Sequence, residues 1–209
     1  MRDPVSETDR ARRIYDRTAG RYDRQIGVFE RLLFEGGREL ACSRAEGDTL
    51  EIAFGTARNL PFYDPAVRLT GIELSPEMVA VAHERQRELG READLRVGDA
   101  QALDFDDQSF DTVVSTLTLC TIPDPDRALT EAFRVLRPGG RVVALEHVRS
   151  PTGAVRAVQR LLNPLAVRFE ADHLLREPLE YLKRAGFEID ELERSKWGIV
   201  ERLTAVKPG

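Results

Sequence analysis

Short apolar runs rich in β-branched residues alternate with longer segments of helical period along most of this chain. The runs that we predict as strands are residues 49–54, 68–74, 94–99, 110–119 and 141–148. Strands that are apolar on both faces are typical of parallel sheets, because helices cover both sides of such a sheet. The alternation therefore predicts a doubly wound α/β fold with a mostly parallel sheet.

Two of the predicted helices have clear start signals. Ser75 and Asp124 each stand immediately before a proline. A short polar side chain accepts a hydrogen bond from the first helical turn, and proline fits the first helical position. Gly90 and the glycines of residues 137–140 mark the two helix ends.

The segments outside this alternation are expected to flank the sheet. Residues 1–41 contain one or two amphipathic helices that form a lid or flank, and residues 150–176 are predicted as an irregular insertion over the acceptor side. The last two apolar runs, joined by a short loop at Trp197, predict an antiparallel hairpin that completes a seven-stranded sheet. We expect residues 1–209 to form one domain.

Composition excludes several classes of protein. The net charge of -5 gives no overall basic field, so no nucleic-acid partner is expected, although a local basic patch stays open. The two cysteines, Cys42 and Cys120, lie far apart, which favours neither a disulfide framework nor a metal site. No apolar run is long enough for a signal peptide or a transmembrane helix, so we expect a cytoplasmic protein.

The turn after the first predicted strand is compact but poor in glycine. Gly55 permits a left-handed backbone and close approach of a ligand, whereas Ala53 and Ala57 stand where a dinucleotide loop prefers glycine. Because a diphosphate needs a further glycine to reach the helix N-terminus, the loop favours a cofactor without phosphates. A plain strand-to-helix turn fits these residues as well.

Two carboxylates at successive strand ends indicate an adenosine. Glu73 follows Glu51 by 22 residues, close to the offset at which an acid accepts hydrogen bonds from ribose hydroxyls. Asp99 ends the next strand, where its carboxylate can accept from an exocyclic amine while the backbone N–H of Ala100 donates to a ring nitrogen. Each acid alone fits a solvated strand end, but the pair favours adenosine binding.

Several longer motifs carry a family resemblance. The segments "LEIAFGTARNLPFY", "GIELSPEM", "LRVGDAQALDFDDQSFDTVVSTLTLCTIPD" and "EAFRVLRPGGRVVALEHV" resemble the motif series of class I S-adenosylmethionine-dependent methyltransferases. The resemblance runs from about residue 10 to the end. Within that family, the chain is most similar to the branch that contains bacterial phosphatidylethanolamine N-methyltransferases and quinone C-methyltransferases. The segments "LCTIPD", "EHVRSP" and "DHLLREPLEYLKRAGF" are close to the former group.

The resemblance implies a site for S-adenosyl-L-methionine. Gly55 would lie beside the methionyl part, Glu73 on the ribose, and Leu74 with Met78 on the adenine faces. The full set of implied cofactor residues is Glu51, Ala53, Gly55, Glu73, Leu74, Met78, Asp99, Ala100, Thr116 and Cys120. Ala57 departs from the glycine that is usual in the family. No metal is implied.

Methyl transfer needs alignment of acceptor, methyl group and sulfur more than acid catalysis. A base helps only with a protonated acceptor, and the candidates are His147 and His173, each of which also fits a structural role. Tyr15 and Tyr22 are candidates to close over the pocket, or to anchor a helix. The segment "GAVRAVQRLLNPLAVRF" fits an acceptor cover or a peripheral membrane contact, and we expect its burial against the domain.

The expected function is methyl transfer to a small lipid-like or aromatic acceptor, with N-methylation of an amine-headed phospholipid as the first choice. The alternative enzyme is a C-, O- or S-methyltransferase for a quinone, secondary metabolite or thiol. A nicotinamide oxidoreductase would share the ribose acid but needs a phosphate-binding loop. An adenosine-ligand-binding module without turnover is the alternative outside enzymes.

Overall fold

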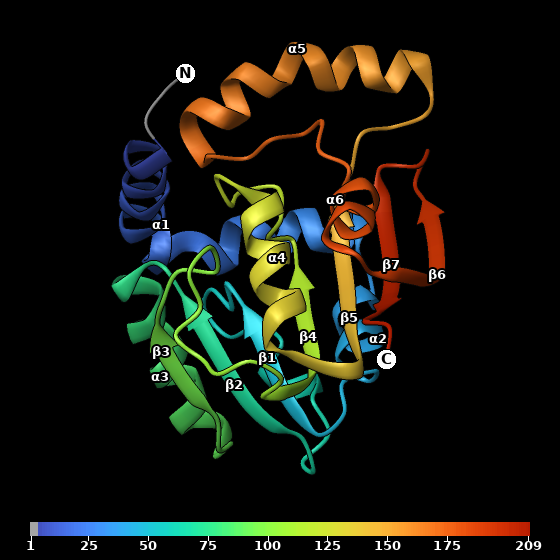
Figure 1. Cartoon of the computed structure of the whole chain (residues 1–209). Helices are drawn as coiled ribbons and strands as arrows, with labels where there is room; N and C mark the ends of the chain where they lie inside the picture. The colour runs from blue at the N-terminus through green and yellow to red at the C-terminus, as the bar shows by residue number, and fades with distance from the viewer. Residues whose placement is uncertain (1–3) are drawn as a thin grey trace.

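The computed structural model describes residues 4–209, in which a seven-stranded sheet lies between two layers of helices (Figure 1). The strand order is β3-β2-β1-β4-β5-β7-β6. The strands are β1 Asp48–Ile52, β2 Arg68–Glu73, β3 Asp94–Val97, β4 Phe110–Thr116, β5 Leu136–His147, β6 Glu188–Ser195 and β7 Val200–Val206.

Pairing within the sheet is parallel from β3 to β5, and β7 is antiparallel to both β5 and β6. The predicted mostly parallel sheet with an antiparallel C-terminal hairpin strand is therefore confirmed. The chain order reverses between β1 and β4, and ligands of doubly wound sheets bind at the carboxyl ends of the strands beside such a reversal.

Helices cover both faces of the sheet. They are α1 Pro4–Leu33, α2 Gly37–Cys42, α3 Pro76–Leu89, α4 Pro125–Val135, α5 Gly153–Glu170 and α6 Pro178–Ala185, with a short 3-10 helix, η1, at Leu60–Phe62. Leu129 of α4 and Leu182 of α6 are buried against one face, and Ala82 of α3 against the other. Such burial of apolar side chains on both faces stabilises the layered core.

The two predicted helix starts are present. Ser75 Oγ accepts a hydrogen bond from the backbone N–H of Met78 at 3.2 Å, and Asp124 Oδ1 accepts from that of Arg127 at 3.0 Å. Gly90 closes α3 with a φ of 60°, a conformation that glycine adopts without strain. These local signals place the N-terminus of α3 beside the carboxyl end of β2.

The predicted start of the fifth strand is wrong. We expected a strand from residue 141, but β5 begins at Leu136, which pairs with Phe110. The pairing shifts its register before it resumes at Arg141. The intervening turn is tight, since a Cβ on Gly140 would lie 2.9 Å from the carbonyl oxygen of Arg137.

The prediction for residues 150–176 is also wrong, because most of this segment is the helix α5. Pro164 interrupts its sequence pattern, yet the helix continues through it. The expected burial is wrong as well, since no residue of α5 is buried. Gln159 and Asn163 hold the helix on the body through hydrogen bonds to the segments before and after it.

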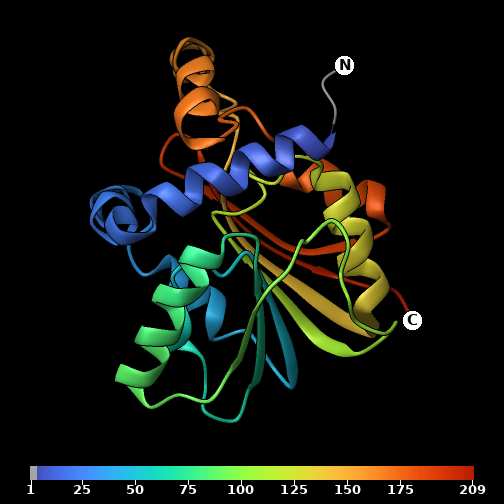
Figure 2. The same cartoon turned by 90° about the vertical axis from the view of Figure 1, so that its left-hand side faces the viewer.

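The helices α1 and α5 lie at the carboxyl end of the sheet. Figure 2 shows α1 crossing the carboxyl end of the sheet, with α5 on the far side of α1. The predicted lid or flank at 1–41 thus corresponds to α1 and α2, except for the first three residues, which lie outside the described part. The prediction of one domain over 1–209 includes these residues and stays a prediction.

Candidate functional site

A pocket lies at the carboxyl ends of the strands, and residues of α1 form part of its lining. Most of the cofactor residues expected from the sequence line it, and two aromatic side chains of α1 face it from the opposite side. The lining includes Ala53, Gly55, Glu73, Leu74, Met78, Asp99, Ala100 and Thr116, together with Tyr15 and Tyr22. The fold therefore brings most of the predicted cofactor residues, which come from several strand ends, together in one pocket.

The turn after β1 adopts left-handed backbone at alternate residues. The φ angles are 50° at Ala53, 59° at Gly55 and 57° at Ala57. Such angles are uncommon for alanine and concentrate at functional sites, where the surrounding structure maintains them. A Cβ on Gly55 would meet no atom within 4 Å, so its backbone angle, rather than lack of space, favours glycine there.

Glu73 is fixed at the end of β2 by backbone donors. Its Oε2 accepts from the N–H of Gly55 at 3.0 Å, and its Oε1 accepts from the N–H of Ser75 at 2.9 Å. Burial raises the pKa of Glu73, against the lowering effect of these bonds. A carboxylate accepts about four hydrogen bonds, so acceptor capacity remains for a diol in the pocket.

The end of β3 presents a second polar group. Asp99 Oδ1 accepts from the backbone N–H of Gln101 at 2.9 Å, which turns the chain beneath the pocket. The Gln101 side chain also lines the pocket, and its Oε1 accepts from the N–H of Asp124 at 3.0 Å. The sequence analysis missed Gln101, because its only signal was its position two residues after Asp99.

Glu51 does not line the pocket, although we expected it to contact the cofactor. It is buried, and it accepts hydrogen bonds from Tyr63 Oη and Asn59 Nδ2, both at 2.8 Å. Burial raises the pKa of Glu51 to about 7. Arg38, which does line the pocket, donates to Asn59 Oδ1 at 2.8 Å. Glu51 therefore supports the pocket wall from behind.

Acidic side chains at intervals of seven residues attach α1 to the core. Ser75 Oγ donates to Asp16 Oδ1 and Thr56 Oγ1 donates to Asp23 Oδ1, both at 2.6 Å. Further along the helix, Glu30 forms ion pairs with Arg38 and Arg58.

Asp23 also pairs with Arg85 of α3. Residues seven apart share one face of a helix, so these bonds hold a single face of α1 against the pocket. The rings of Tyr15 and Tyr22 meet edge to face, with centroids 6.3 Å apart. The sequence analysis missed these acids, although their regular spacing was a signal.

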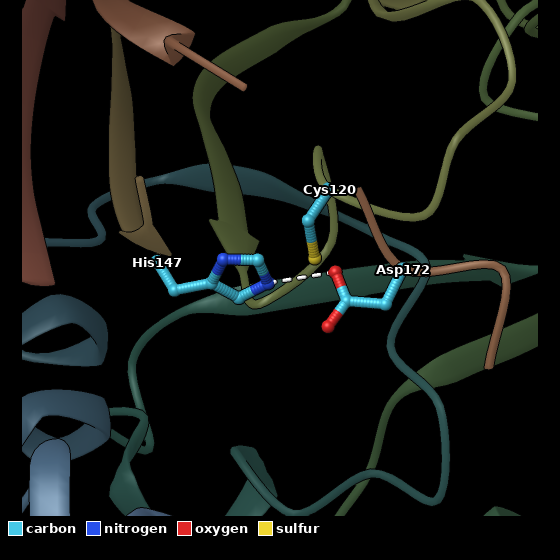
Figure 3. A group of neighbouring side chains, drawn as sticks. All are labelled: Cys120, His147 and Asp172. Carbon is cyan, nitrogen blue, oxygen red and sulfur yellow. Dashed lines mark hydrogen bonds and ion pairs between the residues drawn. The ribbon is translucent and has the colours of Figure 1, made fainter. Parts of the chain in front are cut away.

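A second polar cluster comprises Cys120, His147 and Asp172 (Figure 3). His147 Nε2 lies 2.8 Å from Asp172 Oδ1. Burial alone would lower the pKa of His147, but the adjacent Asp172 carboxylate outweighs it and raises that pKa. Burial opposes the charge of Asp172, and the pairing with His147 still lowers its pKa. The two side chains therefore form a buried ion pair when His147 is protonated.

None of the three side chains of this cluster lines the pocket, but Tyr15, which does line it, lies near Asp172. Burial raises the pKa of Tyr15, and the negative charge of Asp172 raises it further. Cys120 was expected to border the cofactor, and its side chain lies in the cluster instead. Burial raises the pKa of Cys120, so it stays a thiol at neutral pH.

His173 lies next to the cluster without joining it. Its backbone N–H donates to the carbonyl oxygen of Cys120 at 3.0 Å, and its half-buried imidazole has a pKa lowered by burial.

The cluster of Cys120, His147 and Asp172 offers sulfur, imidazole and carboxylate, which are groups that bind zinc in proteins. However, Arg176 donates to the carbonyl oxygens of Leu119 and Ile122, and its fixed positive charge beside Cys120 disfavours a cation.

Known proteins resemble the chain over the region that contains the pocket-lining strand ends. A family model described as a methyltransferase domain matches residues 50–144. A human thiol S-methyltransferase, TMT1A, is 32% identical over 171 residues, which cover 79% of this chain and 70% of the relative. The chain belongs to the class I S-adenosylmethionine-dependent methyltransferases. Its cofactor is S-adenosylmethionine, and the prediction of a methyltransferase is confirmed.

Two further matches refine this picture of the methyltransferase. The phosphatidylethanolamine N-methyltransferase of Cereibacter sphaeroides is 42% identical over 126 residues, which cover 59% of this chain and only 60% of the relative. A solved S-adenosylmethionine-dependent methyltransferase from Thermotoga maritima has a TM-score of 0.72 at 23% identity, over 93% of this chain and 99% of the other. The structural match supports the fold alone.

None of the helices between residues 4 and 209 is both long enough and apolar enough to cross a bilayer.

Proposed function

We propose that this methyltransferase transfers the methyl group of S-adenosylmethionine to the amine nitrogen of a phospholipid head group. The observation that carries the proposal is the buried Asp172–His147 pair, which lies near Tyr15 of the pocket. An amine-headed acceptor arrives as an ammonium ion, which needs an anion to attract it and a group to take its proton. The identity with the phosphatidylethanolamine N-methyltransferase supports the same acceptor class.

The cofactor would occupy the strand-end side of the pocket. In this arrangement Glu73 accepts from the ribose hydroxyls, Asp99 and the backbone of Ala100 bind the adenine edge, and Met78 packs on the ring. The support is that all four residues line one pocket, with Glu73 anchored by two backbone donors. The methionyl part would then follow the glycine-containing turn after β1.

The acceptor would enter beside α1. Tyr15 and Tyr22 present ring faces that attract both the sulfonium and the ammonium. The ammonium first gives a proton to His147 in its neutral form, and the Asp172 carboxylate stabilises the resulting imidazolium. The freed nitrogen lone pair then attacks the methyl carbon. As the carbon–nitrogen bond forms, the carbon–sulfur bond breaks, and its electron pair stays on sulfur as a neutral thioether.

A thiol acceptor is the second candidate, because the human thiol S-methyltransferase matches a larger share of this chain. A thiol loses its proton near neutral pH more readily than an ammonium, so a thiol acceptor depends less on a base.

The cytoplasmic location predicted from the sequence also remains part of the proposal, supported by the two free cysteines.

The test is a comparison of acceptors with purified protein and radiolabelled S-adenosylmethionine. Phosphatidylethanolamine in detergent micelles, a small alkyl thiol and a reduced quinone are offered separately. We expect label in the phospholipid, and we expect Asp172→Asn to lose this activity while Cys120→Ser retains it. Transfer to the thiol or quinone with none to phosphatidylethanolamine would contradict the proposed acceptor.

A further inference from the structure

The helix α5 has its polar and apolar faces in an unusual orientation. Its amide side chains face the protein: Gln159 Nε2 donates to the carbonyl oxygens of Val148 and Leu174 at 2.9 and 3.1 Å, and Asn163 Oδ1 accepts from the N–H of Leu174 at 2.9 Å. A surface helix normally turns its apolar face to the core. In α5 the apolar face is turned away from it.

The outward face is broad and apolar. Its exposed fractions are 56% at Val158, 76% at Leu161, 47% at Leu162, 56% at Leu165 and 65% at Phe169. These positions follow the helical intervals of three and four residues, so they form one continuous stripe. Exposed apolar surface of this extent marks an interaction site.

Basic residues accompany this stripe. Within α5, Arg160 and Arg168 are exposed and Arg156 is half-buried, and the only acid of the helix is Glu170 at its end. Positive charge is therefore concentrated on α5 although the chain as a whole carries -5.

The helix α1 adds arginines to the same region. Arg10 donates to the carbonyl oxygen of Arg168 at 2.9 Å, so this face of α1 meets the C-terminal end of α5. Arg13 and Arg17 follow Arg10 at intervals that keep them on this face, and both are exposed. Figures 1 and 2 show α5 at the outer end of the molecule, beyond α1.

We propose that α5 and the arginines of α1 bind the surface of a bilayer that contains anionic lipids. An amphipathic helix lies in the plane of such a surface, with apolar side chains at the acyl boundary and arginines among the head groups. The charge pattern favours this partner, because an anionic head-group layer complements a basic rim around an apolar stripe.

The surface adjoins the proposed acceptor entrance. Tyr15, which lines the pocket, donates from its hydroxyl to the carbonyl oxygen of Glu170 at the end of α5, at 3.2 Å. A phospholipid leaving the bilayer there would meet the tyrosines of α1. This delivery step rests on the proposed function, whereas binding of the surface to a bilayer does not.

The test uses co-sedimentation with vesicles of phosphatidylglycerol and phosphatidylcholine, neither of which has a primary amine. The variant Leu161→Gln/Leu165→Gln keeps good helix formers while it removes apolar contact. The matched control is Leu89→Gln/Leu192→Gln, which alters leucines that are exposed elsewhere. A third variant, Arg160→Gln/Arg168→Gln, tests the charge.

We expect the wild-type protein to sediment with these vesicles, and added salt to weaken that binding. The α5 leucine variant should bind at least about tenfold more weakly, the control should bind as wild type, and the arginine variant should be weakened and less sensitive to salt. Unchanged binding by the leucine variant would overturn the proposal.

Absence of wild-type binding would also overturn it, and an α5-dependent dimer in sedimentation equilibrium would then identify a second copy of the chain as the partner. Vesicle binding without methylation of phosphatidylethanolamine would leave the surface assignment standing and would refute only the proposed acceptor.

Discussion

The proposed cofactor side of the pocket and the proposed acceptor side, which is the Asp172–His147 pair near it, hold their carboxylates in different ways. On the cofactor side, Glu73 is bound by backbone N–H groups of the turns that follow β1 and β2. On the acceptor side, Asp172 is bound by the side chain of His147, which comes from the end of β5. Backbone donors persist whatever side chains surround them, whereas a side-chain pair changes with one substitution. The acceptor side is therefore the part in which specificity can change without loss of the cofactor site.

The largest effect that separates the two sides is expected from His147→Gln. Loss of the proton acceptor should lower kcat for an amine acceptor by on the order of a hundredfold. The dissociation constant of S-adenosylmethionine should stay unchanged, because His147 does not line the pocket. Steady-state kinetics at saturating cofactor, together with calorimetric titration, measure the two quantities. A parallel loss of cofactor affinity would refute the separation.

The converse variant is Glu73→Gln. An amide cannot accept from two backbone donors as well as a carboxylate does, and the proposed charge-assisted bonds to the ribose are lost. We expect cofactor binding to weaken by about 2 to 3 kcal/mol, measured by calorimetry on protein shown to be folded. Glu77→Gln, at an exposed neighbour on α3, is the control and should bind as wild type. Wild-type affinity in the Glu73 variant would disprove the ribose assignment.

A smaller effect should follow from loosening α1, which covers both sides. Asp23→Asn weakens the partly exposed pairs with Arg85 and Arg58, and such pairs contribute up to about 1 kcal/mol each. We expect cofactor dissociation to accelerate about threefold to tenfold in stopped-flow measurements. Asp9→Asn is the matched control, because Asp9 pairs with Arg12 within the same helix. Equal rates in both variants would show that α1 does not retain the cofactor.

The smallest expected effect concerns stability against pH. The pKa of His147 is raised in the folded protein, so its contribution to the free energy of unfolding is present below the ordinary histidine pKa. That contribution is lost as pH rises through the raised value. The difference in unfolding free energy between wild type and His147→Gln should therefore shrink from pH 6 to pH 9 in urea titrations. A difference that grows with pH would contradict the ion pair with Asp172.

Local rules of the chain account for the parts that the sequence predicted well. The strand ends that carry Glu73 and Asp99 follow from apolar periodicity, and the start of α3 follows from Ser75 and its proline. Each of these features depends on residues within one or two helical turns. The same rules wrongly placed Glu51 at the cofactor. Periodicity does not say whether a strand side chain faces the pocket or the interior behind its wall.

What the sequence by itself determined is the sheet, the helices other than α5 and the strand-end acids of the proposed cofactor side, since hydrophobic periodicity, caps and strand-end acids act over short separations. Only the tertiary structure decided the acceptor side. The meeting of Cys120, His147 and Asp172 depends on how three distant segments pack. The outward apolar face of α5 depends on Gln159 and Asn163 finding backbone partners on the body. An amphipathic pattern states that a helix has two faces, and the hydrogen bonds available around it select which face turns inward.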